Sequence, residues 1–263
     1  MMIPLLVGLL TAASVAPPAA LEASMRIEIA RVATPGGSEA GPYAALGPIV
    51  AQMLTPDGAV DMDWYGSAGG VRATLHERLS MLPAGAVVVQ RAGAAAIQVM
   101  NPAARTYFDL PAAAAADGGS GVPDVVLQPT GEFATIAGAR AERHTVTLTL
   151  ALPPARGVPA WSGLPANLTI VGDIWLTDAF AGAQYASILK TLDALMAIPG
   201  LSRTVPAGAF PMKTRLRLTL LPGYELRSEI TRLAAAAVDP RALDVPAEFH
   251  RVAPPGQGAG GTR

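Results

Sequence analysis

Residues that could do chemistry are few in this sequence, and they are widely scattered. The three histidines, His76, His144 and His250, lie too far apart for any two to share a helix face at the spacing of a zinc-binding motif. His144 stands at the start of a strand-like segment, where a position at the rim of a sheet explains it. The histidines therefore indicate neither a metal site nor a general base.

Two aspartates form the best-spaced acidic pair. Asp61 and Asp63 are two residues apart, so they share one face of an extended strand and could point two carboxylates into a cleft. Solvated positions on an outer strand face account for them more simply. No serine lies in a G-x-S-x-G sequence, and the glycine clusters lack the lysine and the strand–helix context of a phosphate-binding loop. These residues predict no catalytic centre, no metal site and no cofactor.

Composition excludes several further classes. The chain has no cysteine, which excludes disulfides, a cysteine nucleophile and the acylated cysteine of a bacterial lipoprotein. Its net charge is −1, so nothing marks it as a binder of nucleic acid or of an anionic membrane surface. Aromatic residues make up only 5% of the chain, and the core must therefore rest on Leu, Val and Ile.

The N-terminal segment predicts export. Residues 1–16 are an uncharged apolar run, followed by Pro17-Pro18 and small residues. This run is too short to span a bilayer comfortably, and a signal peptide over residues 1–23 is the interpretation we favour. No Lys or Arg precedes it, and a buried N-terminal helix is the alternative. We expect a periplasmic or secreted bacterial protein with no membrane span in its mature chain.

Hydrophobic periodicity predicts a β-rich chain. His144, Val146, Leu148 and Leu150 alternate with threonines, which is typical of a half-buried antiparallel strand. Turn signals every eight to ten residues favour a meander of adjacent strands. The expected strands cover residues 25–32, 59–65, 70–75, 86–90, 95–100, 106–110, two segments within 125–151, 168–176, 214–220 and 224–233.

One helix is expected with a clear apolar stripe. Residues 185–198 place Ile188, Leu189 and Leu192 on one face, and Pro199-Gly200 ends the segment. A weaker helix over residues 43–54 is interrupted by Gly47-Pro48. We predict a mainly β fold over residues 25–252: a single curved antiparallel sheet forming an open half-barrel with the helix as its plug. The loops 111–123 and 153–165 are irregular, and residues 253–263 form a disordered tail.

Several short motifs resemble a known family. They are Val99-Met100-Asn101-Pro102 with Arg105-Thr106-Tyr107-Phe108, Thr130-Gly131-Glu132, Ile136-Ala137-Gly138, Ile174-Trp175-Leu176-Thr177, Val238-Asp239-Pro240 and Val245-Pro246-Ala247-Glu248-Phe249. Their order and spacing resemble an uncharacterised family of exported bacterial proteins, a domain of unknown function that is similar in fold to LolA-type lipoprotein carriers. The resemblance covers residues 58–252. It implies a strongly curved half-barrel with a concave apolar face, and it carries no catalytic residues.

The candidate ligand-binding residues are apolar. Large side chains are scarce, so Trp175 is a candidate, together with Ile174, Leu148, Leu189 and Leu192. Trp175 and Ile174 have opposite parity along one strand, so only one of the two can face a cavity.

Three functions remain open at this point. The favoured one is a non-enzymatic envelope protein that holds a lipid, another apolar ligand or a lipidated protein. The alternative is a protein-interaction or sensory module of the cell envelope, which would use a sheet edge or a long loop. A hydrolase is the remote alternative, and it would gain support if two of Asp61, Asp63, His76 and His144 met in one pocket.

Overall fold

A computed structural model describes residues 20–33, 46–80, 82–111, 124–151, 167–179, 205–206, 208–218 and 221–254. Within these ranges, one 12-stranded sheet makes up most of the structure, and α1 (Leu46–Leu54) is the helix. The strands are β1 (Ala20–Arg31), β2 (Ala59–Ser67), β3 (Gly70–Leu75), β4 (Val87–Arg91), β5 (Ala96–Asn101), β6 (Thr106–Pro111), β7 (Asp124–Ile136), β8 (Ala139–Ala151), β9 (Asn167–Thr177), β10 (Phe210–Leu218), β11 (Tyr224–Ala236) and β12 (His250–Arg251).

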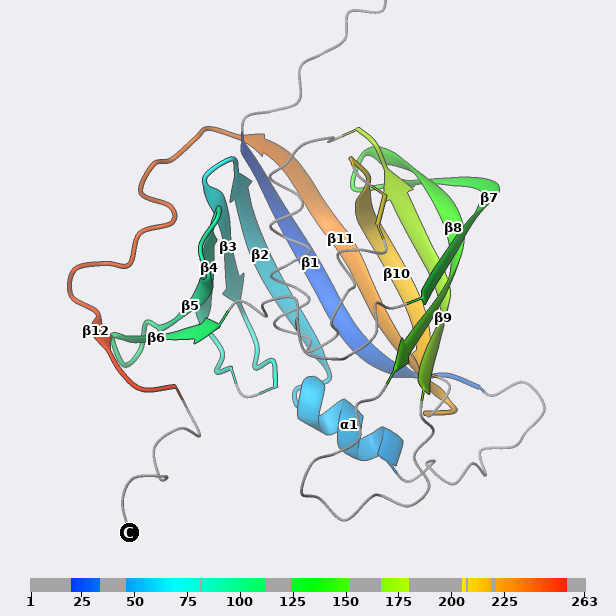
Figure 1. Cartoon of the computed structure of the whole chain (residues 1–263), viewed down its shortest axis with the longest axis horizontal. Helices are drawn as coiled ribbons and strands as arrows, with labels where there is room; N and C mark the ends of the chain where they lie inside the picture. The colour runs from blue at the N-terminus through cyan, green and yellow to red at the C-terminus, as the bar shows by residue number, and fades with distance from the viewer. Residues whose placement is uncertain are drawn as a thin grey trace, which may run out of the picture.

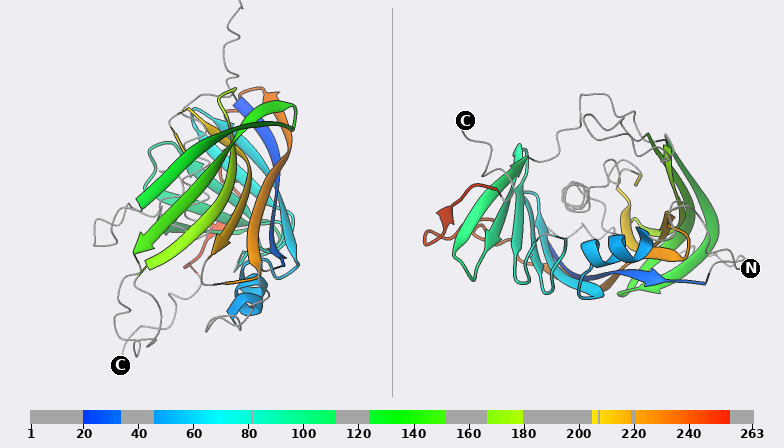
Figure 2. Two further views of the ribbon diagram at one scale, coloured as in Figure 1. Left: turned by 90° about the vertical axis from the view of Figure 1, so that its right-hand side faces the viewer. Right: turned by 90° about the horizontal axis from the view of Figure 1, so that it is seen from below.

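The sheet is a meander whose two halves meet at the N-terminal strand. Its order is β12-β6-β5-β4-β3-β2-β1-β11-β10-β9-β8-β7, so β1 lies between β2 and β11 and joins the two halves of the chain. All pairs are antiparallel except the short β12–β6 pair. Figure 1 shows the strands side by side, and the view from below in Figure 2 shows them as an open U. The predicted fold class, a mainly β chain with one open curved antiparallel sheet, is confirmed.

The expected elements correspond closely to the observed ones. Each predicted strand is present, and β1 begins five residues earlier than expected. The Gly47-Pro48 pair does not interrupt α1 but lies in its first turn. Backbone N–H groups in the first turn have no partner within the helix, so the missing N–H of proline costs no hydrogen bond there. The helix predicted over residues 185–198, residues 1–19 of the expected signal peptide and the regions 112–123, 152–166 and 255–263 lie outside the described residues.

The two faces of the sheet are identified by the C-terminal segment, residues 237–252. It runs along the outside of one arm of the U, next to β6 (Figures 1 and 2). Leu243 and Phe249 of this segment pack against Val87 and Val89. Side chains alternate along a strand, so Val88 points to the concave side. We call the face that includes Val88 the inner face and the face that includes Val87 and Val89 the outer face.

The inner face is apolar over most of the sheet. Two clusters of buried side chains cover it. The first includes Ile27, Val60, Met62, Trp64, Leu75, Val88 and Val99, and the second includes Val146, Leu148, Ile170, Ile174 and Leu216. Burying each such side chain contributes about 1.5–3 kcal/mol, so this face supplies most of the stabilisation of the sheet.

The outer face is polar outside the area that residues 237–252 cover. Ion pairs connect neighbouring strands there: Arg26–Asp61 at 3.0 Å, Lys213–Glu229 at 2.6 Å, Arg227–Glu28 at 3.3 Å and Arg232–Glu22 at 3.3 Å. All but Arg232–Glu22 join residues directly across from each other. Opposite charges in that position favour a strand register by about 0.2–1 kcal/mol per pair. These pairs therefore contribute to the register at the centre of the sheet.

Candidate functional site

The inner face of the second half of the sheet is the best-defined candidate site. Leu148 pairs with Ile170, and Val146 pairs with Gly172, so strands β8 and β9 present one continuous apolar surface. Val125 and Leu127 of β7 pack against the same cluster and are only partly buried. This surface offers hydrocarbon contacts to a ligand.

A polar row crosses this apolar surface. His144, Ile174, Thr214 and Ser228 are aligned across four adjacent strands. The Thr214 and Ser228 hydroxyl oxygens are 2.8 Å apart, and Thr214 is buried. The row therefore places two hydroxyl groups and an imidazole among aliphatic side chains.

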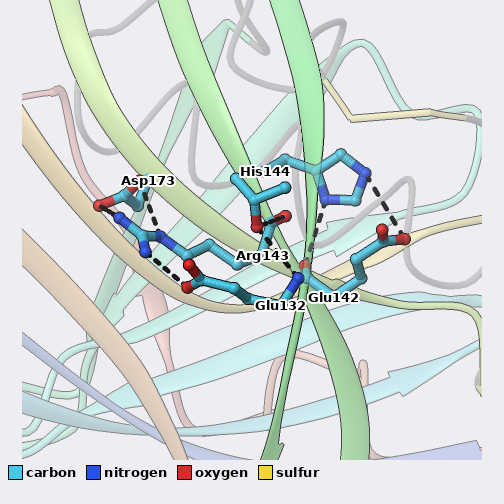
Figure 3. Close-up of polar contacts among 6 residues, drawn as sticks. Glu132, Glu142, Arg143, His144 and Asp173 are labelled. Carbon is cyan, nitrogen blue, oxygen red and sulfur yellow. Dashed lines mark hydrogen bonds and ion pairs between the residues drawn. The ribbon is translucent and has the colours of Figure 1, made fainter.

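His144 contacts Glu142 through both ring nitrogens, as Figure 3 shows. Its Nδ1 lies 3.2 Å from the Glu142 carbonyl oxygen, and its Nε2 lies 4.0 Å from a Glu142 carboxylate oxygen. The His144 side chain is 15% exposed, so the imidazole is largely shielded from water. This half-buried pair is suited to hydrogen bonding with a polar group of a ligand.

Trp64 is the second polar feature of the inner face. It is 3% exposed and packs within the first cluster, yet its indole Nε1–H has no hydrogen-bond acceptor. A buried donor without a partner costs about 1–3 kcal/mol, and a buried indole N–H normally finds an acceptor. This donor is the one buried side-chain nitrogen or oxygen without a partner among the described residues.

The acidic pair and His76 meet on the outer face. The His76 Nε2 lies 2.8 Å from the Asp63 carboxylate, and the Ser24 hydroxyl donates to the same carboxylate at 2.6 Å. Catalysis by a serine needs the hydroxyl bonded to the imidazole, but here the aspartate stands between them. The His76 and Asp63 side chains are also 50% and 55% exposed. The arrangement fits an exposed hydrogen-bonded contact rather than a hydrolase triad.

The electrostatics of Asp63 follow from these contacts. The hydrogen bond from Ser24 lowers the pKa of this carboxyl, partial burial opposes the shift, and His76 lowers it further. Asp61 forms a separate contact with Arg26 at 3.0 Å, and its backbone N–H donates to Glu77 at 2.6 Å. The two aspartates share a strand face, as predicted, but each has its own partners.

Arg143 joins three strands on the outer face, opposite His144 in Figure 3. Its guanidinium donates two hydrogen bonds to Asp173, at 3.0 and 3.1 Å, and one to Glu132 at 2.6 Å. The hydrogen bonds to Asp173 and then to Glu132 raise the pKa of Arg143 above its ordinary value. Trp175 pairs with Arg143, and the charged groups of Arg143, Lys213 and Arg215 each lie 5.8 Å from its ring centre.

The structure divides the predicted ligand-binding residues between two faces. Leu148 and Ile174 lie together in the second inner-face cluster. Trp175 points to the other side of β9 from Ile174, where it lies near three cations and packs against the first cluster, so it is not brought together with them. Leu189 and Leu192 lie outside the described residues.

Two further features of the described residues concern metals and membranes. No group of three or more histidine, aspartate or glutamate side chains in these ranges could hold a metal ion. Nor does any helix in the same ranges have the length and apolarity needed to cross a membrane.

The motifs that carry the family resemblance occupy structural positions. Thr130-Gly131-Glu132 forms the bulge between Pro129 and Phe133, where the Thr130 hydroxyl donates to the Arg143 carbonyl at 2.9 Å. Asn101 accepts a hydrogen bond from the backbone of Ala104 in the β5–β6 turn. Farther along the chain, the Asp239 N–H donates to the Tyr65 hydroxyl at 2.8 Å and attaches the C-terminal segment to β2. These three contacts stabilise a bulge, a turn and the attachment of the C-terminal segment, whereas Ile174 and Leu176 of another motif lie in the second inner-face cluster.

Sequence reasoning missed the polar groups of the inner face. The alternation that places His144 with Val146 and Leu148 was visible, and Trp64 shares its parity with Val60 and Met62. The unpartnered indole N–H and the Thr214–Ser228 contact depend on which strands are neighbours, and no single strand contains that information.

Comparison with known proteins gives similarity in structure only. No protein-family model and no curated protein sequence matches the chain. An uncharacterised conserved protein of Thermus thermophilus has 8% identity and a TM-score of 0.43, covering 90% of this chain and 91% of its own. The lipoprotein LppX of Mycobacterium tuberculosis has 10% identity and a TM-score of 0.36, covering 86% and 90%. A LolA superfamily protein of Nitrosomonas europaea has 8% identity and a TM-score of 0.33, covering 87% and 91%.

A LolA superfamily protein is thus among the structures to which the chain is similar, as the motifs predicted. At these identities and TM-scores the similarity establishes no shared ligand.

Proposed function

We propose that this chain is a non-enzymatic exported protein that binds a lipid or another acyl-chain ligand on the inner face of its curved sheet. The observation that carries the proposal is the contrast between the two faces. The inner face is mainly hydrocarbon in both halves of the sheet, whereas the outer face is ion-paired or covered by residues 237–252. An apolar concave face with a few polar groups is typical of a ligand-binding site, and an open curved sheet provides one.

The ligand in this proposal lies along β7, β8 and β9. Val125, Leu148 and Ile174 provide apolar contacts. Leu189 and Leu192, which lie outside the described residues, remain proposed members of the same surface. His144 and Glu142 lie at the same face and receive the polar end of the ligand. Trp175 is not part of this surface, because its side chain is on the other side of β9 from Ile174 and packs against the first cluster.

A matched pair of valine substitutions tests the proposal. Val125 is on the inner face and half-buried, whereas the adjacent Val126 is 46% exposed on the other side of β7. Val125→Thr should weaken binding of the apolar probe N-phenylnaphthylamine by about tenfold, because burying a hydroxyl without a partner costs about 1–3 kcal/mol. Val126→Thr is the control, and it should leave probe affinity unchanged.

Native mass spectrometry provides the second arm of this test. The protein recovered from the bacterial envelope should carry a bound lipid. Finding no bound lipid and no probe binding would rule the proposal out. Equal affinity loss in the two valine variants would place the ligand elsewhere on the molecule.

One observation favours the alternative function, a protein-interaction module. In the sheet order, β7 is the last of the described strands, and Val126 and Phe133 on it are 46% and 51% exposed. A terminal strand can pair with an extended segment of another protein. In that case, Val126→Lys should abolish recovery of an envelope partner while leaving probe binding intact.

A further inference from the structure

The starting observation is the unpartnered indole of Trp64. Its Nε1–H is buried on the inner face, the same face that the proposed function assigns to an acyl-chain ligand. The other polar features of this face differ from it, because Thr214 and Ser228 contact each other, His144 contacts Glu142, and the buried Gln90 also has a partner. Trp64 is therefore the donor on this face that still requires an acceptor.

The protein around Trp64 does not supply that acceptor. Ala23 and Ala73 are its direct cross-strand neighbours, and Met62 and Gly66 are its neighbours on the same face of β2. None of these side chains carries an oxygen or a nitrogen. A water molecule at this position would need about two to four polar partners, and the side chains of these four neighbours offer none.

The surroundings also restrict the chemistry of an acceptor from outside. The four neighbours include no Lys or Arg, so among these side chains a carboxylate or phosphate next to Trp64 would be a buried charge without a counter-ion. A neutral acceptor flanked by hydrocarbon fits instead. The carbonyl of an ester has two acceptor lone pairs, no donor and an alkyl chain on each side.

We infer that Trp64 donates a hydrogen bond from its indole N–H to the ester carbonyl of an acyl lipid bound on the inner face. This inference rests on the proposed function and specifies its ligand as an ester lipid whose carbonyl, rather than a charged group, lies next to Trp64. The carbonyl oxygen of the ester then supplies the acceptor that the indole lacks. The alkyl chains on either side of the ester supply hydrocarbon that matches the surrounding side chains.

Two phospholipids test the inference. Diheptanoyl phosphatidylcholine and its diether analogue share headgroup and chain length, but only the first has carbonyl groups. Each is titrated below its micelle concentration against the full-length, delipidated protein carrying N-phenylnaphthylamine. The wild-type protein should bind the diester about tenfold more tightly than the diether, because one hydrogen bond to a formerly unpaired buried donor is gained.

Substitutions then assign this preference to Trp64. Trp64→Phe keeps an aromatic ring but removes the N–H, and it should lower diester affinity to that of the diether. Trp175→Phe removes an equal N–H from a ring on β9 that lies near Arg143, Lys213 and Arg215, and it should keep the preference. Equal wild-type affinities for the two lipids, or a preference that survives in Trp64→Phe, would overturn the inference and leave the proposed function standing. Failure of either lipid to displace the probe would overturn both.

A measurement on the wild-type protein covers the case in which Trp64→Phe does not fold. The indole N–H resonance of Trp64, assigned with the Trp161→Phe and Trp175→Phe variants, should move downfield when the diester binds. It should stay in place with the diether, and identical shifts for the two lipids would contradict the inference.

Discussion

At the scale of single residues, Glu225 shows how the outer face tolerates a buried charge. Its side chain is 6% exposed, and it accepts hydrogen bonds from Arg227 at 2.7 Å and from Arg217 at 3.2 Å. Burial alone would raise the pKa of Glu225, but the two arginines outweigh burial and hold the pKa below its ordinary value. A carboxylate in this situation stabilises the fold only while it is ionised.

Glu225→Gln should therefore destabilise the protein in a pH-dependent manner. At neutral pH we expect a loss of about 1–2 kcal/mol, since charged hydrogen bonds contribute about 1.5–3 kcal/mol and both arginines are partly exposed. The folded-state pKa is lowered, so the contribution is complete above the unfolded pKa of about 4.3 and is lost as the pH falls through the folded value. Urea unfolding of both proteins between pH 7 and pH 3, on the order of one measurement per pH unit, checks this.

Glu229→Gln is the matched control. Glu229 lies on the same strand and pairs with Lys213 at 2.6 Å, but its side chain is 47% exposed. An exposed ion pair contributes about 0–1 kcal/mol, so this variant should change the stability little at any pH. Equal losses in the two variants would show that burial does not distinguish these two carboxylates.

At the scale of elements, the close approach of β9 and β10 depends on a glycine. A Cβ atom at Gly172 would overlap the backbone carbonyl of Arg215, and a backbone atom cannot move aside as a side chain can. Gly131, at the bulge of β7, differs from it: its φ of +74° favours glycine, but a Cβ atom there would meet nothing. Two glycines on neighbouring parts of the sheet are thus required for different reasons.

Alanine substitutions at Gly172 and Gly131 should distinguish the close backbone approach at the first position from the positive φ at the second by the stability that each variant loses. Gly172→Ala should cost about 3 kcal/mol or more, because forced overpacking adds to a backbone shift between paired strands. Gly131→Ala should cost about 1–2 kcal/mol, which is the strain of a left-handed backbone conformation for a residue with a side chain. Denaturant unfolding measures both, and the reverse order would contradict the close approach of β9 to β10.

The elements could be predicted from the sequence far better than the face on which each residue lies. Each expected strand is present because alternation and turn residues are local signals. Val87, Val88 and Val89 show the limit, since all three are buried and their faces are distinguished only by Leu243, which is distant in the sequence. The same limit applies to the candidate site: Trp175 was a reasonable choice by size, but its neighbours Lys213 and Arg215 come from a distant strand.

At the scale of the whole molecule, the two ends of the described chain complete the sheet in different ways. Residues 237–252 cover the outer face of one arm, with Leu243 buried against Val87 and Met100. The N-terminal strand β1 lies at the centre and has partners on both sides. The first residues of β1 are therefore part of the core, although the sequence pattern predicted the end of a signal peptide among them.

This position of β1 leads to a prediction about processing. Ala20 and Leu21 are 0% and 2% exposed, and Ala20 pairs with Ser67 on one side and Ala236 on the other. Cleavage after Ser24 would remove these contacts, and the buried Leu21 side chain alone contributes about 1.5–3 kcal/mol. If the protein is exported as proposed, its mature chain should begin at or before Ala20.

Intact-mass measurement of the exported protein determines this end, and chains beginning at Ala20 and at Met25 provide the comparison. The shorter chain should unfold at lower urea concentration, and equal stability of the two, or a mature chain beginning at Met25, would contradict the central role of these five residues.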